Sequence, residues 1–320
     1  MFRNYQLAYL LRNVKIKEVR TLTFHKQGMA YVLAKSARHI PHGAVVGHLD
    51  MTPVLEYGKK ARAAAKTASA SNKPSVRPAL YKNLWPFLVK AIAHCLHDLP
   101  ELNSFLDYAT WRTSGTVYVA EDINVGFTVH TDYGVLKPVL RNPHRETLAT
   151  VADQMASLSK RARHTDPEAL YHEAAKAYMY TSLREFDLSG LPGLLTWLRA
   201  RLRWRKSRAA FREVPPDQKL SVQDILGATT TVANIGVSFT GHHSVGVIMP
   251  PEIMTFGVGD VRLMPWVVDG KVEARPIVTV AVSIDHRAYD GGDAFPMFGH
   301  MKRYVEAPEL IYEWQPSDRP

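Results

Sequence analysis

The run Ile277–Ile284, IVTVAVSI, is the segment that most restricts how this chain can fold. Its β-branched residues predict a buried strand. Directly after it His286 stands between Asp285 and Arg287, and Asp290 and two glycines follow, which permit a tight turn into a helix. Neighbouring carboxylates can fix the tautomer and orientation of an imidazole, as a general base requires. From these residues alone, a catalytic base and a turn-capping ion cluster both remain open.

The composition is that of a globular protein. The chain has 320 residues, 46% of them hydrophobic, which is enough for one large domain or two modest ones. The formal net charge is +10, and residues 195–213, with seven basic residues and one glutamate, account for six of these charges. Neither a zinc-finger spacing nor an RNP-like aromatic strand accompanies this segment. The sequence therefore does not predict binding to nucleic acid.

The sequence favours a cytoplasmic location. The first twenty residues contain Arg12 within their apolar patch and lack a small-residue cleavage site, so we expect no secretory signal. No run approaches the roughly 18 apolar residues of a membrane-spanning helix. Cys95 is the single cysteine and cannot form an internal disulfide. It lies in an apolar helical pattern, which predicts a buried structural thiol in a reducing compartment.

Helices and strands are predicted in an irregular order. We expect helices at 84–99, 146–163 and 292–305, and one that begins after Asp50. We expect two strand-forming runs within 116–129, and strands at 45–49, 135–140, 229–232, 244–249, 253–261, 266–268 and 277–284. The strands are too scattered for a regular βαβ array, so the fold class is α/β or α+β. No GxGxxG follows a strand and no GxxxxGK[ST] occurs, so neither nucleotide-binding motif is present.

The segment DHRAYDG from Asp285 is similar to the D-H-R-x-x-D-G signature of the 2-oxo acid dehydrogenase acyltransferases, whose catalytic domains share a fold with chloramphenicol acetyltransferase. Other segments resemble this family in the same order along the chain. They include IPHGAVVGHLDMTPV from Ile40, WPFLVKAIAH from Trp85, NVGFTVHTDYGVLKPVLRNPHR from Asn124 and GATTTVANIG from Gly227. The resemblance covers residues 30 to 165 and 220 to 312.

The resemblance implies a two-layer fold like that of chloramphenicol acetyltransferase, with a mixed β-sheet flanked by helices, and a homotrimer with its active sites between subunits. It also implies an acyltransferase that moves an acyl group between coenzyme A and a thiol, amine or hydroxyl acceptor, with His286 as general base. Asp290 would hold the local fold through an ion pair, and Asp285 with Arg287 would lock the turn. Coenzyme A or acyl-CoA would be a substrate, and neither a metal nor a bound lipoyl group is expected.

Ala233 departs from the family pattern. The family usually has a serine or threonine at this position, and its hydroxyl stabilises the oxyanion of the reaction. Thr231, on the same side of an extended strand, or the amide of Asn234 would have to replace it. Loss of one such donor typically costs about two to three orders of magnitude in rate. The alternative function is therefore a non-catalytic trimeric scaffold that keeps the acyltransferase fold.

Other polar residues carry weaker signals. Lys137 and Arg141 lie beside a matched strand, where they would either meet the phosphates of coenzyme A or remain exposed strand-end charges. His39, His42 and His48 are close in sequence but lack acidic or cysteine companions, so they predict no metal site.

The resemblance divides the chain into an N-terminal extension, 1–29, and an acyltransferase catalytic domain, 30–320. The extension is too short for the lipoyl and subunit-binding domains that members of the family usually carry. A lipoyl domain or an acyl carrier protein would therefore act in trans. The polar, proline-containing end from Glu313 predicts that assembly stops at the trimer.

A basic helical insert at about 165–220 interrupts the catalytic domain. Its first half, from Pro167, has a helical pattern, and its second half, 191–212, places leucines and arginines on different sides of a helix. One interpretation is a helical hairpin packed on the trimer. A second is an interfacial helix on anionic lipid, which would make the protein peripheral at the inner face of a membrane. A third is a lid or docking surface for coenzyme A phosphates or an acidic carrier protein.

Overall fold

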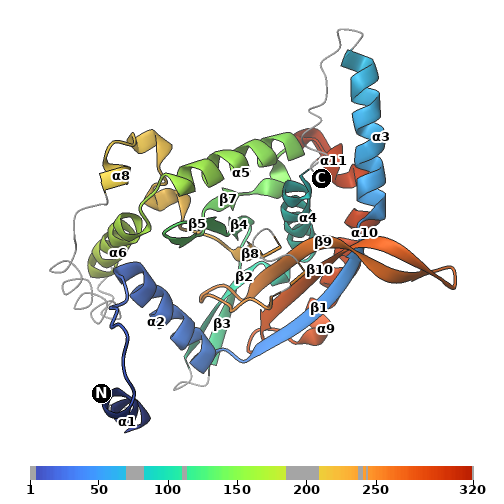
Figure 1. Ribbon diagram of the computed structural model, residues 1–320. Helices are drawn as coiled ribbons and strands as arrows, with labels where there is room; N and C mark the ends of the chain where they lie inside the picture. The colour runs from blue at the N-terminus through green and yellow to red at the C-terminus, as the bar shows by residue number, and fades with distance from the viewer. Residues whose placement is uncertain are drawn as a thin grey trace.

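The computed structural model describes residues 5–69, 83–109, 114–184, 209–236, 241–242 and 244–318. Within these ranges a mixed sheet lies at the centre of the molecule (Figure 1). Its six strands follow the order β1-β10-β9-β8-β4-β7. They are β1 (His42–Asp50), β4 (Asn124–Phe127), β7 (Val139–Arg141), β8 (Thr230–Asn234), β9 (Met254–Val268) and β10 (Lys271–Asp285). Only β8 pairs in parallel, with β4 and β9. The mixed sheet flanked by helices confirms the predicted fold class.

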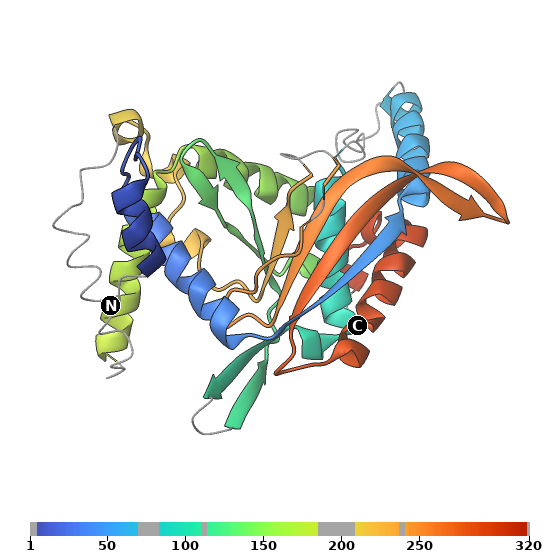
Figure 2. The same cartoon turned by 60° about the horizontal axis from the view of Figure 1, so that its bottom comes forward.

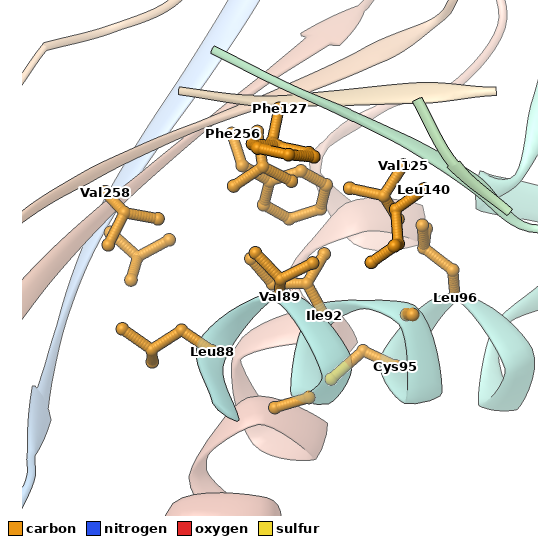
Figure 3. Close-up of a cluster of buried hydrophobic side chains, with 14 of the residues drawn as sticks. Leu88, Val89, Ile92, Cys95, Leu96, Val125, Phe127, Leu140, Phe256 and Val258 are labelled. Carbon is orange, nitrogen blue, oxygen red and sulfur yellow. The ribbon is translucent and has the colours of Figure 1, made fainter. Parts of the chain in front are cut away.

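Helix α4 (Leu84–Asp98) forms the core of the helical layer beneath the sheet (Figure 3). Val89 and Ile92 of this helix point at Phe127 of β4 and Phe256 of β9, and all four side chains are buried. Asn83 caps the start of the helix by accepting a hydrogen bond from the Trp85 N–H. The sequence predicted this buried helix because apolar residues lie on all sides of α4.

The other helices cluster around this core and at the N-terminal end of the molecule. Helices α3, α5, α10 and α11 pack around α4, directly or through one another. The bounds are α1 (Tyr5–Asn13), α2 (Phe24–His39), α3 (Thr52–Ser69), α5 (Leu148–Arg163), α6 (Pro167–Arg184), α8 (Ala209–Arg212), α9 (Gly291–Ala294), α10 (Pro296–Glu306) and α11 (Glu309–Tyr312), with 3-10 helices η2 (Pro100–Leu102), η4 (Pro143–Arg145), η6 (Pro216–Gln218), η7 (Val222–Asp224) and η8 (Pro316–Asp318). No helix in the described ranges is long and apolar enough to cross a membrane.

Three two-stranded pairings extend from the sheet. The outer halves of β9 and β10 project beyond β1 as a long exposed hairpin (Figure 1). Strands β2 (Ser104–Ala109) and β3 (Ser114–Val119) form a second hairpin that projects in another direction (Figure 2), and β3 is exposed along its whole length. Strands β5 (Val129–Thr131) and β6 (Gly134–Leu136) form the third.

Residues 244–249, which we name the strap, were expected to form a strand and do not. The strap crosses the face of the sheet opposite α4, and side chains satisfy its carbonyls. Ser283 Oγ donates to the Gly246 carbonyl at 2.7 Å, and Ser36 Oγ donates to the Ile248 carbonyl at 2.6 Å. The prediction was wrong because these hydrogen bonds come from side chains distant in sequence, so the β-like composition of the strap does not lead to a ladder.

Other expected boundaries also differ. The strands predicted at 253–261 and 266–268 are one strand, β9. Its outer half pairs with β10 but is largely exposed to solvent, so the sequence there has no continuous apolar pattern. The predicted last helix is divided into α9 and α10 at Pro296, which begins the second helix. Helix α2 was not predicted, since its burial is limited to a few residues such as Ser36.

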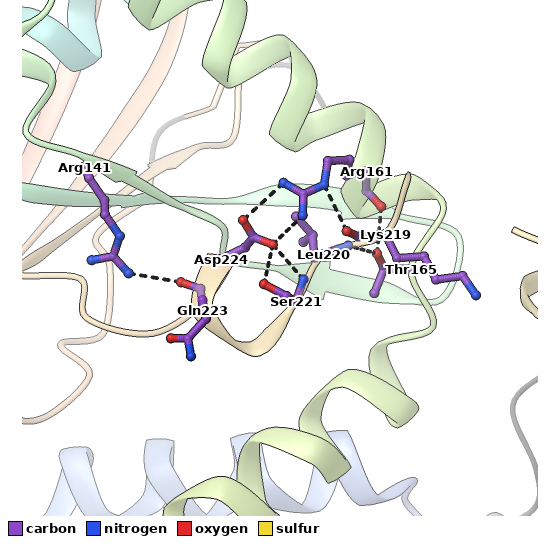
Figure 4. Close-up of polar contacts among 8 residues, drawn as sticks. All are labelled: Arg141, Arg161, Thr165, Lys219, Leu220, Ser221, Gln223 and Asp224. Atoms are coloured by element: carbon purple, nitrogen blue, oxygen red, sulfur yellow. Dashed lines mark hydrogen bonds and ion pairs between the residues drawn. The ribbon is translucent and has the colours of Figure 1, made fainter. Parts of the chain in front are cut away.

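The two ends of the insert meet at a network of polar contacts (Figure 4). Arg161 of α5 forms a bidentate pair with Asp224, at 3.1 and 2.6 Å, and its Nε donates to the Lys219 carbonyl. Thr165 Oγ1 accepts from the Leu220 N–H at 2.8 Å. These contacts bring the two ends of the insert, near 165 and 220, next to each other.

Helix α6 confirms the helix expected in the first half of the insert. It packs against α2, whose first two N–H groups, at Phe24 and His25, both donate to the Glu168 carboxylate at 3.0 Å. The His25 ring stacks on Tyr171 at 4.4 Å. The catalytic domain was expected to begin at 30, and that position lies inside α2. Residues 185–208, which hold most of the segment 191–212, lie outside the described ranges.

Candidate active site

The histidine turn begins where β10 ends. His286 follows Asp285, the last residue of β10, and its backbone N–H donates to the Pro41 carbonyl at 3.0 Å. The ring lies over Gly43 of β1, where an added Cβ would come within 2.5 Å of Nε2. In the single chain the side chain is exposed, and neither ring nitrogen has a hydrogen-bond partner among the described residues. The imidazole is therefore free to accept a proton from a bound molecule.

Asp285 and Arg287 fix the backbone on either side of the histidine. The Arg287 guanidinium donates to both carboxylate oxygens of Asp285, at 2.9 and 2.6 Å, and the Arg287 N–H donates to Oδ1 at 3.0 Å. Asp285 is 2% exposed. Hydrogen bonding to this carboxylate raises the pKa of Arg287, so the pair stays ionised. These hydrogen bonds hold the backbone of the turn on both sides of His286.

Asp290 caps a helix. Its Oδ1 accepts from the N–H groups of Gly292 at 2.7 Å and Asp293 at 3.3 Å, and Asp293 Oδ2 accepts from the Asp290 N–H. This reciprocal arrangement is a capping box at the start of α9. Within the described ranges the structure shows Asp290 in no ion pair, although an ion pair was expected. The carboxylate satisfies backbone donors that would otherwise lack partners.

Strand β8 places the other predicted residues. Side chains alternate along a strand, so Thr231 and Ala233 face the strap side of the sheet, and Asn234 faces the opposite side. The Thr231 hydroxyl donates to Glu252 Oε2 at 2.6 Å. Lys137 Nζ donates to Thr231 Oγ1 at 3.1 Å and to Glu252 Oε1 at 2.7 Å. Thr231, Lys137 and Glu252 thus form one hydrogen-bonded cluster next to Ala233, while Asn234 lies away from it.

Arg141 lies apart from that cluster. Its guanidinium donates to the carbonyl of Gln223 at 3.0 Å (Figure 4) and to that of Leu226 at 3.1 Å. These bonds hold the loop that leads into β8. The side chain remains exposed, so it is available to a further anion.

Within one chain, His286 is far from Ala233. Ala233 is in register with Gly257 of β9, and Gly257 is in register with Ala281 of β10. His286 lies five residues beyond Ala281 and two strands away from β8. With strands about 4.8 Å apart and a rise of about 3.4 Å per residue, the two Cα atoms are roughly 20 Å apart. One carbonyl group cannot contact both positions of the same chain.

Glu252 and Gly43 were missed from sequence. Glu252 is 4% exposed and follows two prolines, and no spacing rule links it to Lys137 or Thr231. A lysine beside a buried strand does signal that a carboxylate partner is needed. Gly43 had no signal, because its role depends on the side chain of a residue over two hundred positions away.

The histidines near Pro41 serve other contacts. His42 Nε2 accepts from the Ile248 N–H at 3.2 Å, and His48 Nδ1 lies 3.0 Å from Thr279 Oγ1. In the part of the chain that the structure describes, no three His, Cys, Asp or Glu side chains are grouped as metal ligands.

Comparison with known proteins identifies one family of acyltransferase domains. The chain matches the model of the family 2-oxoacid dehydrogenases acyltransferase (catalytic domain) over residues 15–169 and 208–313. It is similar to the dihydrolipoyllysine-residue acetyltransferase component of the pyruvate dehydrogenase complex of Staphylococcus epidermidis, with 24% identity over 286 residues. The Staphylococcus aureus protein is also 24% identical. The match covers 89% of this chain and 50 or 51% of those relatives, so the chain spans about half of their length.

Solved structures show the same fold. The probable dihydrolipoamide acetyltransferase of Listeria monocytogenes has a TM-score of 0.59 and 21% identity, covering 91% of this chain and 95% of that one. The dihydrolipoamide acetyltransferase of Azotobacter vinelandii, studied for the roles of a serine, a histidine and an asparagine in its catalytic mechanism, has a TM-score of 0.63 and 20% identity, covering 97% and 98%. Since the family model spans most of the residues, this chain belongs to the family of 2-oxoacid dehydrogenase acyltransferase catalytic domains.

Proposed function

We propose that this chain is an acyltransferase that moves an acyl group between coenzyme A and a thiol, amine or hydroxyl acceptor. The observation that carries the proposal is the exposed His286 ring, which has no hydrogen-bond partner in the described ranges. Pro41 and the Asp285–Arg287 pair hold the backbone of the turn that carries it. A ring nitrogen without another partner can accept a proton from one bound group and return it to another.

The reaction would proceed by proton transfer to and from His286. A ring nitrogen accepts the proton of the attacking thiol, amine or hydroxyl as that group bonds to the thioester carbon. The π electrons of the carbonyl move to its oxygen, which becomes an oxyanion. The tetrahedral adduct then collapses, the bond to the coenzyme A sulfur breaks, and that sulfur receives the proton from His286.

The homotrimer that the resemblance implies would bring the two halves of the site together. His286 and Ala233 of one chain are roughly 20 Å apart by strand geometry. A site that uses both needs a neighbouring subunit to bring its β8 strand to His286. A closed cyclic trimer supplies three such sites with one repeated interface.

The substrates are also part of the proposal. Acyl-CoA would be one substrate, and exposed Arg141 remains a candidate for one of its phosphates. The other candidate, Lys137, forms an ion pair with Glu252, and its side chain is only 20% exposed. The named relatives are components of a complex that works on a dihydrolipoyl lysine residue. A lipoyl domain or an acyl carrier protein in trans, and a cytoplasmic location, are therefore the partners and setting that we propose.

The role of the segment 191–212 stays a prediction from sequence. Its residues up to 208 lie outside the described ranges, and α8 contains the rest. The three interpretations remain a helical hairpin, an interfacial helix on anionic lipid, and a lid or docking surface for coenzyme A phosphates or an acidic carrier protein.

A direct assay tests the proposed activity. We expect the purified chain to release coenzyme A from acetyl-CoA or a longer acyl-CoA when dihydrolipoamide or another thiol, amine or hydroxyl acceptor is present. Release is followed by chromatography, with heat-denatured protein as the control. Absence of turnover across the whole panel of donors and acceptors would contradict the proposal.

Ala233 specifically favours the alternative function, a non-catalytic trimeric scaffold, because alanine cannot donate to an oxyanion. The two functions differ in their affinity for coenzyme A. A scaffold should give no heat of binding in a calorimetric titration with coenzyme A, whereas micromolar binding would support the enzyme.

A further inference from the structure

We propose that the Lys137 ammonium stabilises the oxyanion of the acyl-transfer step, in place of the hydroxyl that is missing at Ala233. This inference rests on the proposed function and assigns Lys137 a different role from the phosphate contact expected from sequence. A cation or hydrogen-bond donor fixed where negative charge develops supplies a large part of the rate enhancement in such reactions.

Gly126 allows Lys137 to reach this position. Lys137 lies between β6 and β7, and its alkyl chain crosses β4 at Gly126. A Cβ at Gly126 would be 3.0 Å from Cδ and 3.1 Å from Cγ of the lysine. Gly126 is in register with Thr231 of β8, so the ammonium is delivered across one strand to the strap side of the sheet.

Thr231 has no proton left to donate. A hydroxyl carries one hydrogen, and that of Thr231 is used in the 2.6 Å bond to Glu252. Its oxygen in turn accepts from Lys137. Thr231 therefore holds the lysine in place and does not itself serve as the donor.

Lys137 retains a donor. An ammonium carries three N–H groups, and the structure uses two, toward Thr231 and Glu252. The lysine side chain is 20% exposed, so the third can point to a bound molecule, while the Glu252 side chain is only 5% exposed. The buried carboxylate compensates the lysine charge before the substrate binds, which avoids an unpaired cation in a poorly solvated position.

The ammonium lies on the face of β8 from which Ala233 projects. Thr231 and Ala233 project from the same face of β8, with Cα atoms about 7 Å apart. Lys137 Nζ lies 3.1 Å from Thr231 Oγ1 on that face. We place the carbonyl oxygen of the substrate on this face beside Thr231, where the third N–H of the ammonium can donate to it.

Every atom in the step is accounted for. The acceptor thiol bonds to the thioester carbon, and its proton passes to His286 of the neighbouring subunit. The carbonyl π electrons move to the oxygen, which accepts a hydrogen bond from Lys137. When the carbonyl re-forms, the bond to the coenzyme A sulfur breaks and His286 returns the proton to that sulfur. Lys137 keeps all its protons throughout.

The main test is the double variant Lys137→Met with Glu252→Gln. Both charges are removed together, since deleting one would leave the other buried and unpaired. We expect kcat to fall about 10²-fold, as for loss of one oxyanion donor, with KM for acyl-CoA changed less than about threefold. Ala233→Ser in the same background should restore at least about tenfold of the lost kcat, because it supplies a hydroxyl donor. A purely structural role for Lys137 predicts no such rescue.

A second variant makes the inference testable even if the double variant does not fold. Ala233→Ser alone changes one half-exposed side chain. We expect it to raise kcat by less than about threefold, because a donor already serves the oxyanion. A rise of about 10²-fold would mean that the position lacked a donor and would overturn the inference.

The wild type and His286→Ala, assayed beside the double variant, distinguish failure of the inference from failure of the proposed function. If the wild type is active and His286→Ala is not, but the double variant turns over like the wild type, the role of Lys137 is wrong and the acyltransferase stands. If the wild type shows no turnover, the proposed function itself fails.

Discussion

Replacing His286 with alanine is expected to lower kcat for acyl transfer by about 10³-fold, within the range for loss of a general base. The ring is the group that carries the transferred proton in the proposed reaction. Its backbone N–H, which alanine keeps, makes the contact with the Pro41 carbonyl. We therefore expect an unchanged melting temperature and KM. The measurement is steady-state release of coenzyme A from acyl-CoA.

His130→Ala is the matched control for this variant. His130 is an exposed histidine on β5 and no step of the reaction involves it, so the control should turn over like the wild type. Equal rates for His286→Ala and the wild type would remove His286 as the base. Acyl transfer would then have to use another base or none.

Replacing Lys90 with methionine is expected to raise the free energy of unfolding at pH 7 by about 2 kcal/mol. Lys90 is fully buried in α4. Its Nζ donates to the Glu146 carbonyl at 2.8 Å, lies 3.0 Å from His94 Nε2 and sits 4.0 Å from the centre of the Trp314 ring. Methionine fills a similar volume without the charge. Because the lost hydrogen bond offsets part of the gain, the increase is smaller than the full cost of burying the amine.

The pH dependence gives the sign of this effect. Burial lowers the pKa of Lys90 to about 7. Between that value and about 10.4, the ordinary lysine pKa, the unfolded chain binds the proton that the folded chain has lost. Stability therefore rises with pH across this window. Burial, followed by the charge of Lys90, lowers the pKa of His94 to about 2, so stability is also lost as pH falls below about 6.5.

Urea unfolding at pH 7 and pH 9.5 measures both expectations. The free energy of unfolding of the wild type should be higher at pH 9.5, and Lys90→Met should remove most of that increase. Lys160→Met, at an exposed lysine of α5, is the control and should keep the slope of the wild type. A wild-type stability that is flat between the two pH values, or a variant with the same slope, would show that Lys90 keeps an ordinary pKa.

The elements that the sequence predicted are those in which one local pattern decides the outcome. The β-branched run 277–284 lies in a buried strand, and the apolar residues of 84–99 surround a buried helix. The glycine pair after Asp290 opens a capped helix turn. In these cases burial on all sides leaves a continuous apolar signal, and the turn chemistry is local.

The parts that the sequence did not predict depend on contacts between distant residues. The strap has a β-like composition, but its carbonyls accept hydrogen bonds from Ser283 and Ser36, which belong to other elements. The cluster of Lys137, Thr231 and Glu252 unites three segments that no motif spacing connects. The sequence pointed to Thr231 because it shares a face of the strand with Ala233. The alternation of side chains along a strand does not show that the Thr231 hydroxyl donates its only hydrogen to Glu252.

The complete site also depends on a second chain. Register places His286 two strands away from Ala233 and five residues further along the sheet than the residue in line with it. The resemblance to a trimeric family suggested an active site between subunits, and the distance within one chain gives that arrangement a physical reason.

The central claim is that each active site takes His286 from one subunit and the face of β8 from its neighbour. The most direct test combines two inactive proteins, His286→Ala and Ala233→Trp, the second of which blocks that face with a large ring. The two chains are co-expressed with different tags, and trimers that carry both tags are purified.

In a cyclic trimer that contains both chains, one of the three sites receives an intact His286 and an unblocked β8. The doubly tagged trimers should therefore recover about one third of the wild-type rate, while each parent alone stays inactive. Doubly tagged trimers with no more activity than the parents would show that both groups act within a single chain, and would contradict the proposed site.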